Sequence, residues 1–193
     1  MESKTTLASA ESIIRQNEAV CHAPITIFAI PKAFTGDSVR IQSNAIASWR
    51  QLSPAVDVLL FGDEAGIAEF ADSVGAFHES RLERNDQGTP LVSSAFARAT
   101  ELSSSPVLVY CNADVILGPD FPRSIEQLSD LASLDQWLAI GQRTDLPVDA
   151  NVDFDDPAEA ESLWHDGRER GVLSSRVCKE SVSYTHLTLP TKA

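Results

Sequence analysis

The chain has 193 residues, of which 43% are hydrophobic and 7% aromatic, and its formal net charge at pH 7 is −13. This length suffices for one domain with a sizeable core. The negative charge would repel nucleic acid and anionic membrane surfaces, so it argues against both as partners. No run approaches the roughly 18 apolar residues of a membrane span, and we expect no integral membrane segment.

The first half of the chain alternates predicted strands and helices. Ile25–Ile30 is a continuous apolar run, which is typical of a buried strand. Residues 38–52 repeat apolar side chains at helical spacing, with Asp37 as the expected cap. A second strand at Val56–Phe61 and a second helix at Glu64–Val74 follow, the latter closed by a glycine at its carboxyl end.

The second half continues the alternation after a short strand at Ala76–Glu79. Thr89 followed by Pro90 predicts a helix cap with proline at the first helical position. The remaining expected elements are a strand at Pro106–Tyr110, a helix at Phe121–Leu131, a strand at Gln136–Ile140 and a helix at Pro157–Arg170.

Strands that are nearly continuously apolar and alternate with helices predict an α/β fold: three α/β/α layers around a mostly parallel sheet. Ligands of such sheets bind outside the carboxyl ends of the strands. The residues expected at these ends are Pro31–Phe34, Gly62, Asp63 and Asn112–Asp114.

Asn112 and Asp114 are the main chemical signal. They lie two positions apart directly after a predicted buried strand, where alternation aims both side chains the same way. Hard cations such as Mg²⁺ and Mn²⁺ prefer such oxygen ligands, and a bound diphosphate supplies the others. The alternative is that both residues only end the strand and bond nearby backbone amides.

Three further positions allow a binding interpretation and a structural one. Asp63 could accept hydrogen bonds from a nucleobase or ribose, or cap the next helix. Gly88 and Thr89 precede a predicted helix, whose amino terminus favours an anion but often has none. Arg143 could reach a phosphate or sugar, or form a surface ion pair.

The two ends of the chain stand apart from the predicted domain at 24–172. Residues 1–23 are expected to be a lead-in segment. Val182–Thr191 resembles one reading frame of a common transposase sequencing adapter. We therefore expect 173–193 to be a junction followed by a non-native tail, with about Ser181–Ala193 forming no part of the fold. The expectation is a domain interrupted at its carboxyl end. Three widely spaced cysteines without a Cys-x-x-Cys motif favour cytoplasmic folding.

Taken together, these stretches are similar to glycosyltransferases of the GT-A class, close to the family-2-like group. The resemblance covers about residues 24–172 in the family's order. It is carried by Ile25–Phe34, Ser43–Trp49, Leu60–Gly66, Gly88–Pro90, Tyr110–Leu117 and Ile140–Arg143.

The resemblance implies a nucleoside-diphosphate sugar as donor, with Pro31, Phe34 and Asp63 holding the nucleoside. It also implies Mn²⁺ or Mg²⁺ at an Asp-x-Asp motif, here Asn112 and Asp114. Because asparagine replaces the first aspartate, Asp114 is the one anionic ligand of the motif. In this group the catalytic base typically lies beyond the region corresponding to Gly171, so no residue here is assigned to that role.

The resemblance implies that the parent protein transfers a sugar to an acceptor, whether glycan, lipid or small molecule. One alternative is a noncatalytic nucleotide-binding or regulatory domain of the same fold, which Asn112 permits. A nicotinamide-dependent dehydrogenase is disfavoured because no Gly-x-Gly-x-x-Gly follows the first strand. A sugar-nucleotide pyrophosphorylase is disfavoured because the glycine-rich, basic loop that it needs there is absent.

Overall fold

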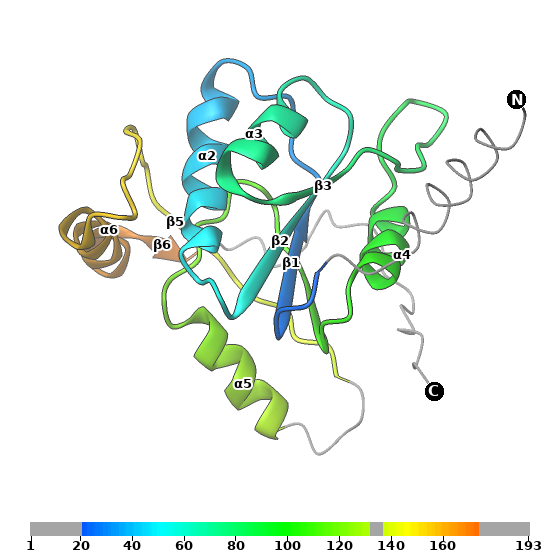
Figure 1. Ribbon diagram of the computed structural model, residues 1–193. Coiled ribbons are helices and arrows are strands. Elements are labelled where there is room, and N and C mark those ends of the chain that lie inside the picture. The colour runs from blue at the N-terminus through cyan, green and yellow to red at the C-terminus, as the bar shows by residue number, and fades with distance from the viewer. Residues whose placement is uncertain (1–20, 132–136, 174–193) are drawn as a thin grey trace, which may run out of the picture.

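A computed structural model describes residues 21–131 and 137–173 (Figure 1). Most of the predicted lead-in and the whole adapter-like tail lie outside this part. The strands of the main sheet are β1 (Ile25–Ala29), β2 (Val56–Phe61), β3 (Phe77–Glu79) and β4 (Val107–Tyr110). The helices are α2 (Asp37–Arg50), α3 (Ile67–Val74), α4 (Val92–Leu102), α5 (Phe121–Leu131) and α6 (Pro157–Arg170).

The main sheet is parallel throughout and has the strand order β3-β2-β1-β4. Ile25, the first residue of β1, pairs with Val56 on one side and with Val107 on the other. Every residue of β1 is buried, as expected for a central parallel strand with both faces covered. The predicted α/β class and the parallel sheet are therefore confirmed.

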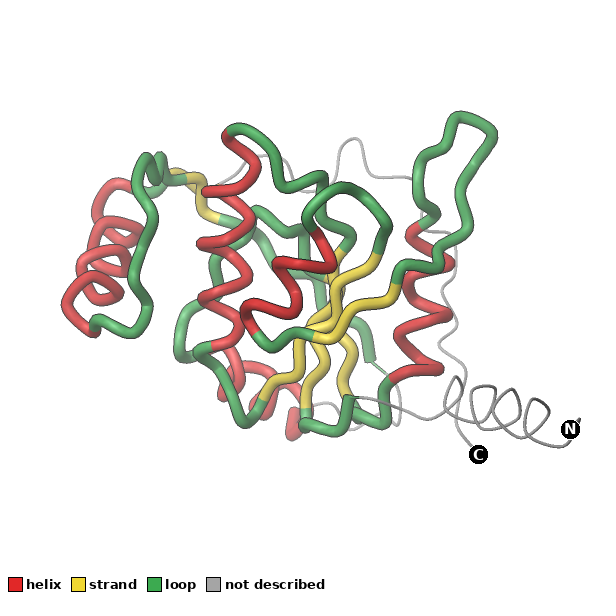
Figure 2. The backbone as a smooth tube through the Cα atoms, turned by 45° about the horizontal axis from the view of Figure 1, so that its top comes forward, coloured by secondary structure: helices red, strands yellow, loops and turns green. Residues whose placement is uncertain are grey.

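Alternate residues of the strands enter two separate cores. Ile27 and Val58 face α2 and α3, whereas Phe28 and Leu59 face α4. Figures 1 and 2 show α2 and α3 on one side of the sheet and α4 on the other. On the α4 side, Phe96 meets Phe28 edge-to-face with ring centroids 4.8 Å apart, a contact that contributes about 0.5–1.5 kcal/mol beyond area burial. The described elements thus form three layers.

Helix α2 follows the predicted apolar spacing. Ala45, Ile46 and Trp49 are all fully buried against the sheet. Gly36, with φ +56°, occupies the N-cap, and Asp37 is the first helical residue, so the prediction that Asp37 caps the helix is wrong. Helix α3 also begins later than predicted, at Ile67, because Gly66 takes a left-handed conformation.

The chain after α5 differs from the prediction of a further strand at Gln136–Ile140. Gln136 lies outside the described residues, and Trp137–Ile140 belong to no strand. Leu138 and Ile140 are exposed, so this apolar run does not enter the described sheet. A separate antiparallel pair, β5 (Thr144–Asp145) and β6 (Val172–Leu173), brackets α6 instead. None of the described helices is long and apolar enough to cross a membrane.

Candidate functional site

The strand order places a topological reversal between β1 and β4. The chain adds β2 and then β3 on one side of β1, and returns through α4 to place β4 on the other side. Connections that diverge in this way leave a crevice outside the carboxyl ends of the two strands, where α/β proteins bind ligands. Here Pro31–Phe34 follow β1 and Asn112–Asp114 follow β4, at the position where such a crevice is expected.

Asn112 and Asp114 are both exposed, and Ala113 between them is buried. A backbone hydrogen bond of 3.0 Å from Cys111 to Phe28 keeps the strand paired up to the motif. The Val115 amide then donates to the Asn112 carbonyl at 3.1 Å and closes a turn. Burial, and secondarily the negative charge of Asp114, raises the pKa of the Cys111 thiol to about 12. Asn112 and Asp114 are therefore exposed to solvent next to a half-buried, neutral thiol.

Helix α2 holds the segment that follows this turn. The Trp49 indole Nε1 donates to the Val115 carbonyl at 2.8 Å, and the Leu117 amide donates to the Ser48 hydroxyl at 3.0 Å. Ser48 is buried and donates in turn to the Ala45 carbonyl. Each of these bonds satisfies a backbone group that burial would otherwise penalise by about 1–3 kcal/mol. These hydrogen bonds hold residues 115–117, which follow Asp114, against α2.

The loop after β1 is held by a buried glutamine. The Gln42 side chain accepts a hydrogen bond from the Lys32 amide at 2.7 Å and donates to the Lys32 carbonyl at 3.0 Å. Pro31 is buried, and the Phe34 ring stacks on Phe70 with centroids 4.4 Å apart. One face of the Phe34 ring therefore packs against α3.

Asp63 lies at the carboxyl end of β2, as predicted, and its side chain is 67% exposed. It does not cap a helix at Glu64, because α3 begins three residues later. Instead it forms an ion pair with Arg84, which also donates to Glu64 at 2.8 Å and to the Gly88 carbonyl at 2.8 Å. Arg84 therefore ties the loop after β3 to the end of β2.

The predicted helix start at Thr89 is wrong. The N-cap of α4 is Leu91, so Thr89 does not begin a helix. The Asn85 side chain accepts from the Thr89 amide at 2.9 Å, and the Asn85 amide donates to the Thr89 carbonyl at 2.9 Å. Because the Asx side chain closes this segment into its own turn, the backbone N–H of Thr89 is already used.

Arg143 has an ion-pair partner, which is the second of the two predicted alternatives. Its Nε donates to Asp145 at 2.8 Å. The pair belongs to β5 and its flank, which lie beside α6 in Figure 1, outside the main sheet. The structure does not bring Arg143 together with the residues at the crevice.

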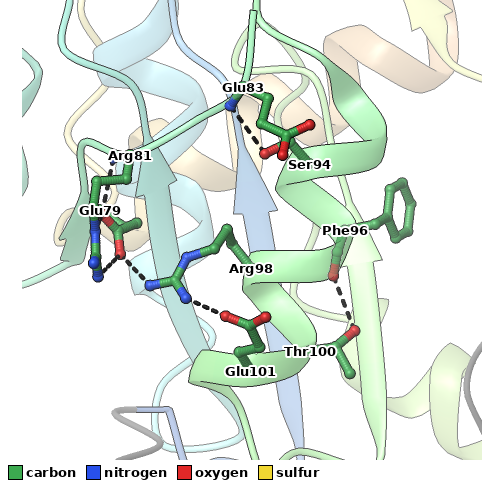
Figure 3. A network of polar contacts seen from close by, with 8 residues as sticks. All are labelled: Glu79, Arg81, Glu83, Ser94, Phe96, Arg98, Thr100 and Glu101. Carbon is green, nitrogen blue, oxygen red and sulfur yellow. Dashed lines mark hydrogen bonds and ion pairs between the residues drawn. The ribbon is translucent and has the colours of Figure 1, made fainter. Parts of the chain in front are cut away.

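A cluster that the sequence did not single out surrounds Glu79, the last residue of β3. Figure 3 shows its carboxylate between Arg81 and Arg98. Burial alone would raise the pKa of Glu79, but the hydrogen bonds from both guanidinium groups outweigh it and lower that pKa to about 2. Arg98 comes from α4, so the cluster joins the end of β3 to the helix on the second face.

No protein-family model, curated protein or solved structure matches this chain. Among residues 21–131 and 137–173, no three histidine, cysteine or acidic side chains form a metal-binding group. Asn112 and Asp114 nevertheless fit an Mg²⁺ or Mn²⁺ ion that keeps waters or substrate oxygens as its other ligands, because both are exposed oxygen donors on one turn.

The sequence did not identify the residues that hold these loops and the Glu79 cluster in place, and two features of those residues explain why. Gln42, Ser48 and Trp49 lie on the inner face of α2, where spacing alone indicates core packing. Arg84 and Arg98 are charged residues of a type that usually remains solvated. The detectable signal was the presence of three polar side chains, Gln42, Asn44 and Ser48, among the buried positions of this helix.

Proposed function

We propose that this chain binds the diphosphate of a nucleoside-diphosphate sugar at the crevice between β1 and β4. In this proposal a divalent cation is held by Asp114 and Asn112, and the parent protein transfers the sugar to an acceptor. The observation that carries it is the exposed Asn112–Asp114 turn at the topological reversal of a parallel sheet. The resemblance to GT-A glycosyltransferases supplies the reaction class.

The residues have distinct expected roles. Asp114 supplies the negative charge and Asn112 a neutral oxygen. Asp63, two strands away, receives the ribose or base after Arg84 leaves it. Neighbouring strands are about 4.8 Å apart, so the ends of β2 and β4 are separated by about 10 Å, a span that a nucleoside diphosphate can bridge. When bound, the cation would neutralise charge that develops on the diphosphate leaving group.

A second candidate is a noncatalytic nucleotide-binding domain of the same fold. Asn112 favours it, because a single carboxylate is a weak cation site on its own. The two candidates share the nucleotide and differ in sugar transfer. Transfer of a labelled donor sugar by the uninterrupted parent protein, measured with and without Mn²⁺, separates them.

Calorimetry with UDP and GDP, each with and without Mn²⁺, tests the binding proposal. We expect Mn²⁺ to raise nucleotide affinity by at least about tenfold, which corresponds to about 1.4 kcal/mol. Asp114→Ala should abolish that gain, and Asn112→Asp should increase it. Glu126→Ala on the exposed side of α5 removes the same charge and is the matched control. Nucleotide binding that is equal with and without Mn²⁺ in every variant would refute the cation site.

A further inference from the structure

Residues 144–173, here named the outer unit, run from β5 through the segment 146–156 and α6 to β6. Figures 1 and 2 show α6 on the far side of α2 from the main sheet. None of residues 144–173, all of which the structure describes, is buried, whereas every residue of β1 is. Burial of apolar side chains, which holds the sheet domain together, therefore contributes little to the attachment of the outer unit.

The outer unit has contacts of its own that join its parts. Its two ends pair with each other, because β5 and β6 are antiparallel neighbours. The Asp156 side chain caps α6 by accepting a hydrogen bond from the Ala158 amide at 2.9 Å. The Phe154 ring, in the segment before α6, lies 6.2 Å from the Trp164 ring on that helix. These contacts allow residues 144–173 to move as one piece.

Polar side chains of α2 and its C-cap hold the segment 146–156. The Asn44 side chain, which is 3% exposed, donates to the Ala150 carbonyl at 2.9 Å and accepts from the Val152 amide at 3.0 Å. Two further side chains donate to this segment: Arg40 to the Val148 carbonyl and Gln51 to the Asp155 carboxylate. Because water can replace each of these polar partners, their net contribution to attachment is small.

Trp164 brings the outer unit next to the chain that follows the candidate site. A Cβ built at Gly118 would lie 4.0 Å from the Trp164 ring, which is an ordinary van der Waals distance. Gly118 is four residues beyond Asp114. The docked outer unit therefore lies against the segment that leads away from the Asn112–Asp114 turn.

We propose that the outer unit detaches from the folded sheet domain and docks again as one piece, and that the two hydrogen bonds of Asn44 hold it in the docked state. Regions with few buried apolar contacts open in contiguous units at a lower free energy than the core. Among the described residues, neither hydrophobic core includes one from the outer unit, so the sheet stays folded when the unit detaches. Detachment removes Trp164 from Gly118 and so changes the surroundings of the Asn112–Asp114 turn.

Amide hydrogen exchange of the full chain, followed by NMR at a series of urea concentrations below unfolding, tests this proposal without any ligand. In the wild type, the Val152 amide and the amides of α6 should share one opening constant, at least about tenfold larger than that of the β1 and β2 amides. Asn44→Ala should raise the shared constant by about tenfold. Asn151→Ala, which removes an exposed amide from the segment itself, is the matched control and should leave the constant unchanged.

A substitution in the core on the α4 side separates detachment from unfolding of the whole domain. Leu59→Val should speed exchange of the β1 and β2 amides by at least about threefold, because packing is lost in the sheet. The α6 amides should not change, since the outer unit detaches while the sheet is folded. Equal acceleration of both sets, or equal opening constants in the wild type, overturns the proposal. Different constants for Val152 and α6 overturn movement as one piece, and an Asn44→Ala variant with unchanged α6 exchange overturns the role of Asn44.

Discussion

Replacing Glu79 by glutamine tests the charge network at the end of β3. The carboxylate is only 10% exposed and is held by two arginines, which lower its pKa from 4.5 to about 2. A carboxyl shifted this far stabilises the folded protein by up to about 3 kcal/mol at neutral pH. Because Arg81 is exposed and its interaction is screened by solvent, we expect about 2 kcal/mol. Glu79→Gln should therefore lower the melting temperature at pH 7 by about 4–8 °C.

The pH dependence decides whether charge causes this loss. The folded-state pKa lies below the unfolded one, so the stabilisation is complete above about pH 4.5 and is lost as the pH falls towards 2. Urea unfolding of the wild type and of Glu79→Gln should differ at pH 7 and converge as the pH approaches 2. Glu101→Gln is the matched control, because Glu101 also pairs with Arg98 but is 60% exposed; its loss should stay below about 0.5 kcal/mol. An equal loss for Glu79→Gln at both pH values would refute the reasoning.

Two further substitutions test the packing of the loops. Gly66→Ala and Gly88→Ala both place a side chain at positive φ, but a Cβ at Gly66 would lie 2.9 Å from the Phe34 Cβ and one at Gly88 would meet nothing within 4 Å. Gly66→Ala should thus lower the free energy of unfolding, measured in urea, by at least about 1 kcal/mol more than Gly88→Ala does. Equal losses in the two variants would contradict the close contact at Gly66. Ser48→Ala removes the acceptor of the Leu117 amide and should cost about 1–3 kcal/mol with faster hydrogen exchange at Leu117. Ser129→Ala, whose hydroxyl bonds within α5 alone, should stay within about 0.5 kcal/mol, and a Ser48→Ala loss of the same size would contradict the role of Ser48.

The sequence was sufficient for those elements whose pattern is local. The apolar runs of β1, β2 and β4 predicted parallel strands, and the spacing of Ile46 and Trp49 predicted the inner face of α2. The predicted burial is found in β1 and most of β2, whereas all four residues of β4 are only partly buried. Gly75 ends α3 in the left-handed conformation, as its position after the helical repeat predicted. These features depend on backbone preference and periodic burial, which a single sequence records directly.

Two predicted elements differ from the structure: the start of α4 and the strand at Gln136–Ile140. Thr89 and Pro90 have the composition of a helix start, but the Asn85 side chain takes the Thr89 amide and delays α4 to Val92. Trp137–Ile140 has the composition of a strand, but in the described part of the chain it pairs with none. Short apolar runs cannot by themselves specify a sheet neighbour.

The candidate site depends on contacts between residues far apart in the sequence, which explains why its support was not predicted. Ser48 and Leu117 are hydrogen-bonded although 69 positions separate them in the sequence, and 21 positions separate Arg84 from Asp63. The loops after β1, β2 and β4 are each held by a polar side chain from another element, in addition to the sheet ladder. A loop that is already ordered loses less conformational entropy when a ligand binds, so more of the contact energy remains as affinity. Substitutions that remove these polar contacts should therefore lower the affinity of any ligand that binds at the carboxyl ends of the strands, even a ligand that contacts none of the substituted residues.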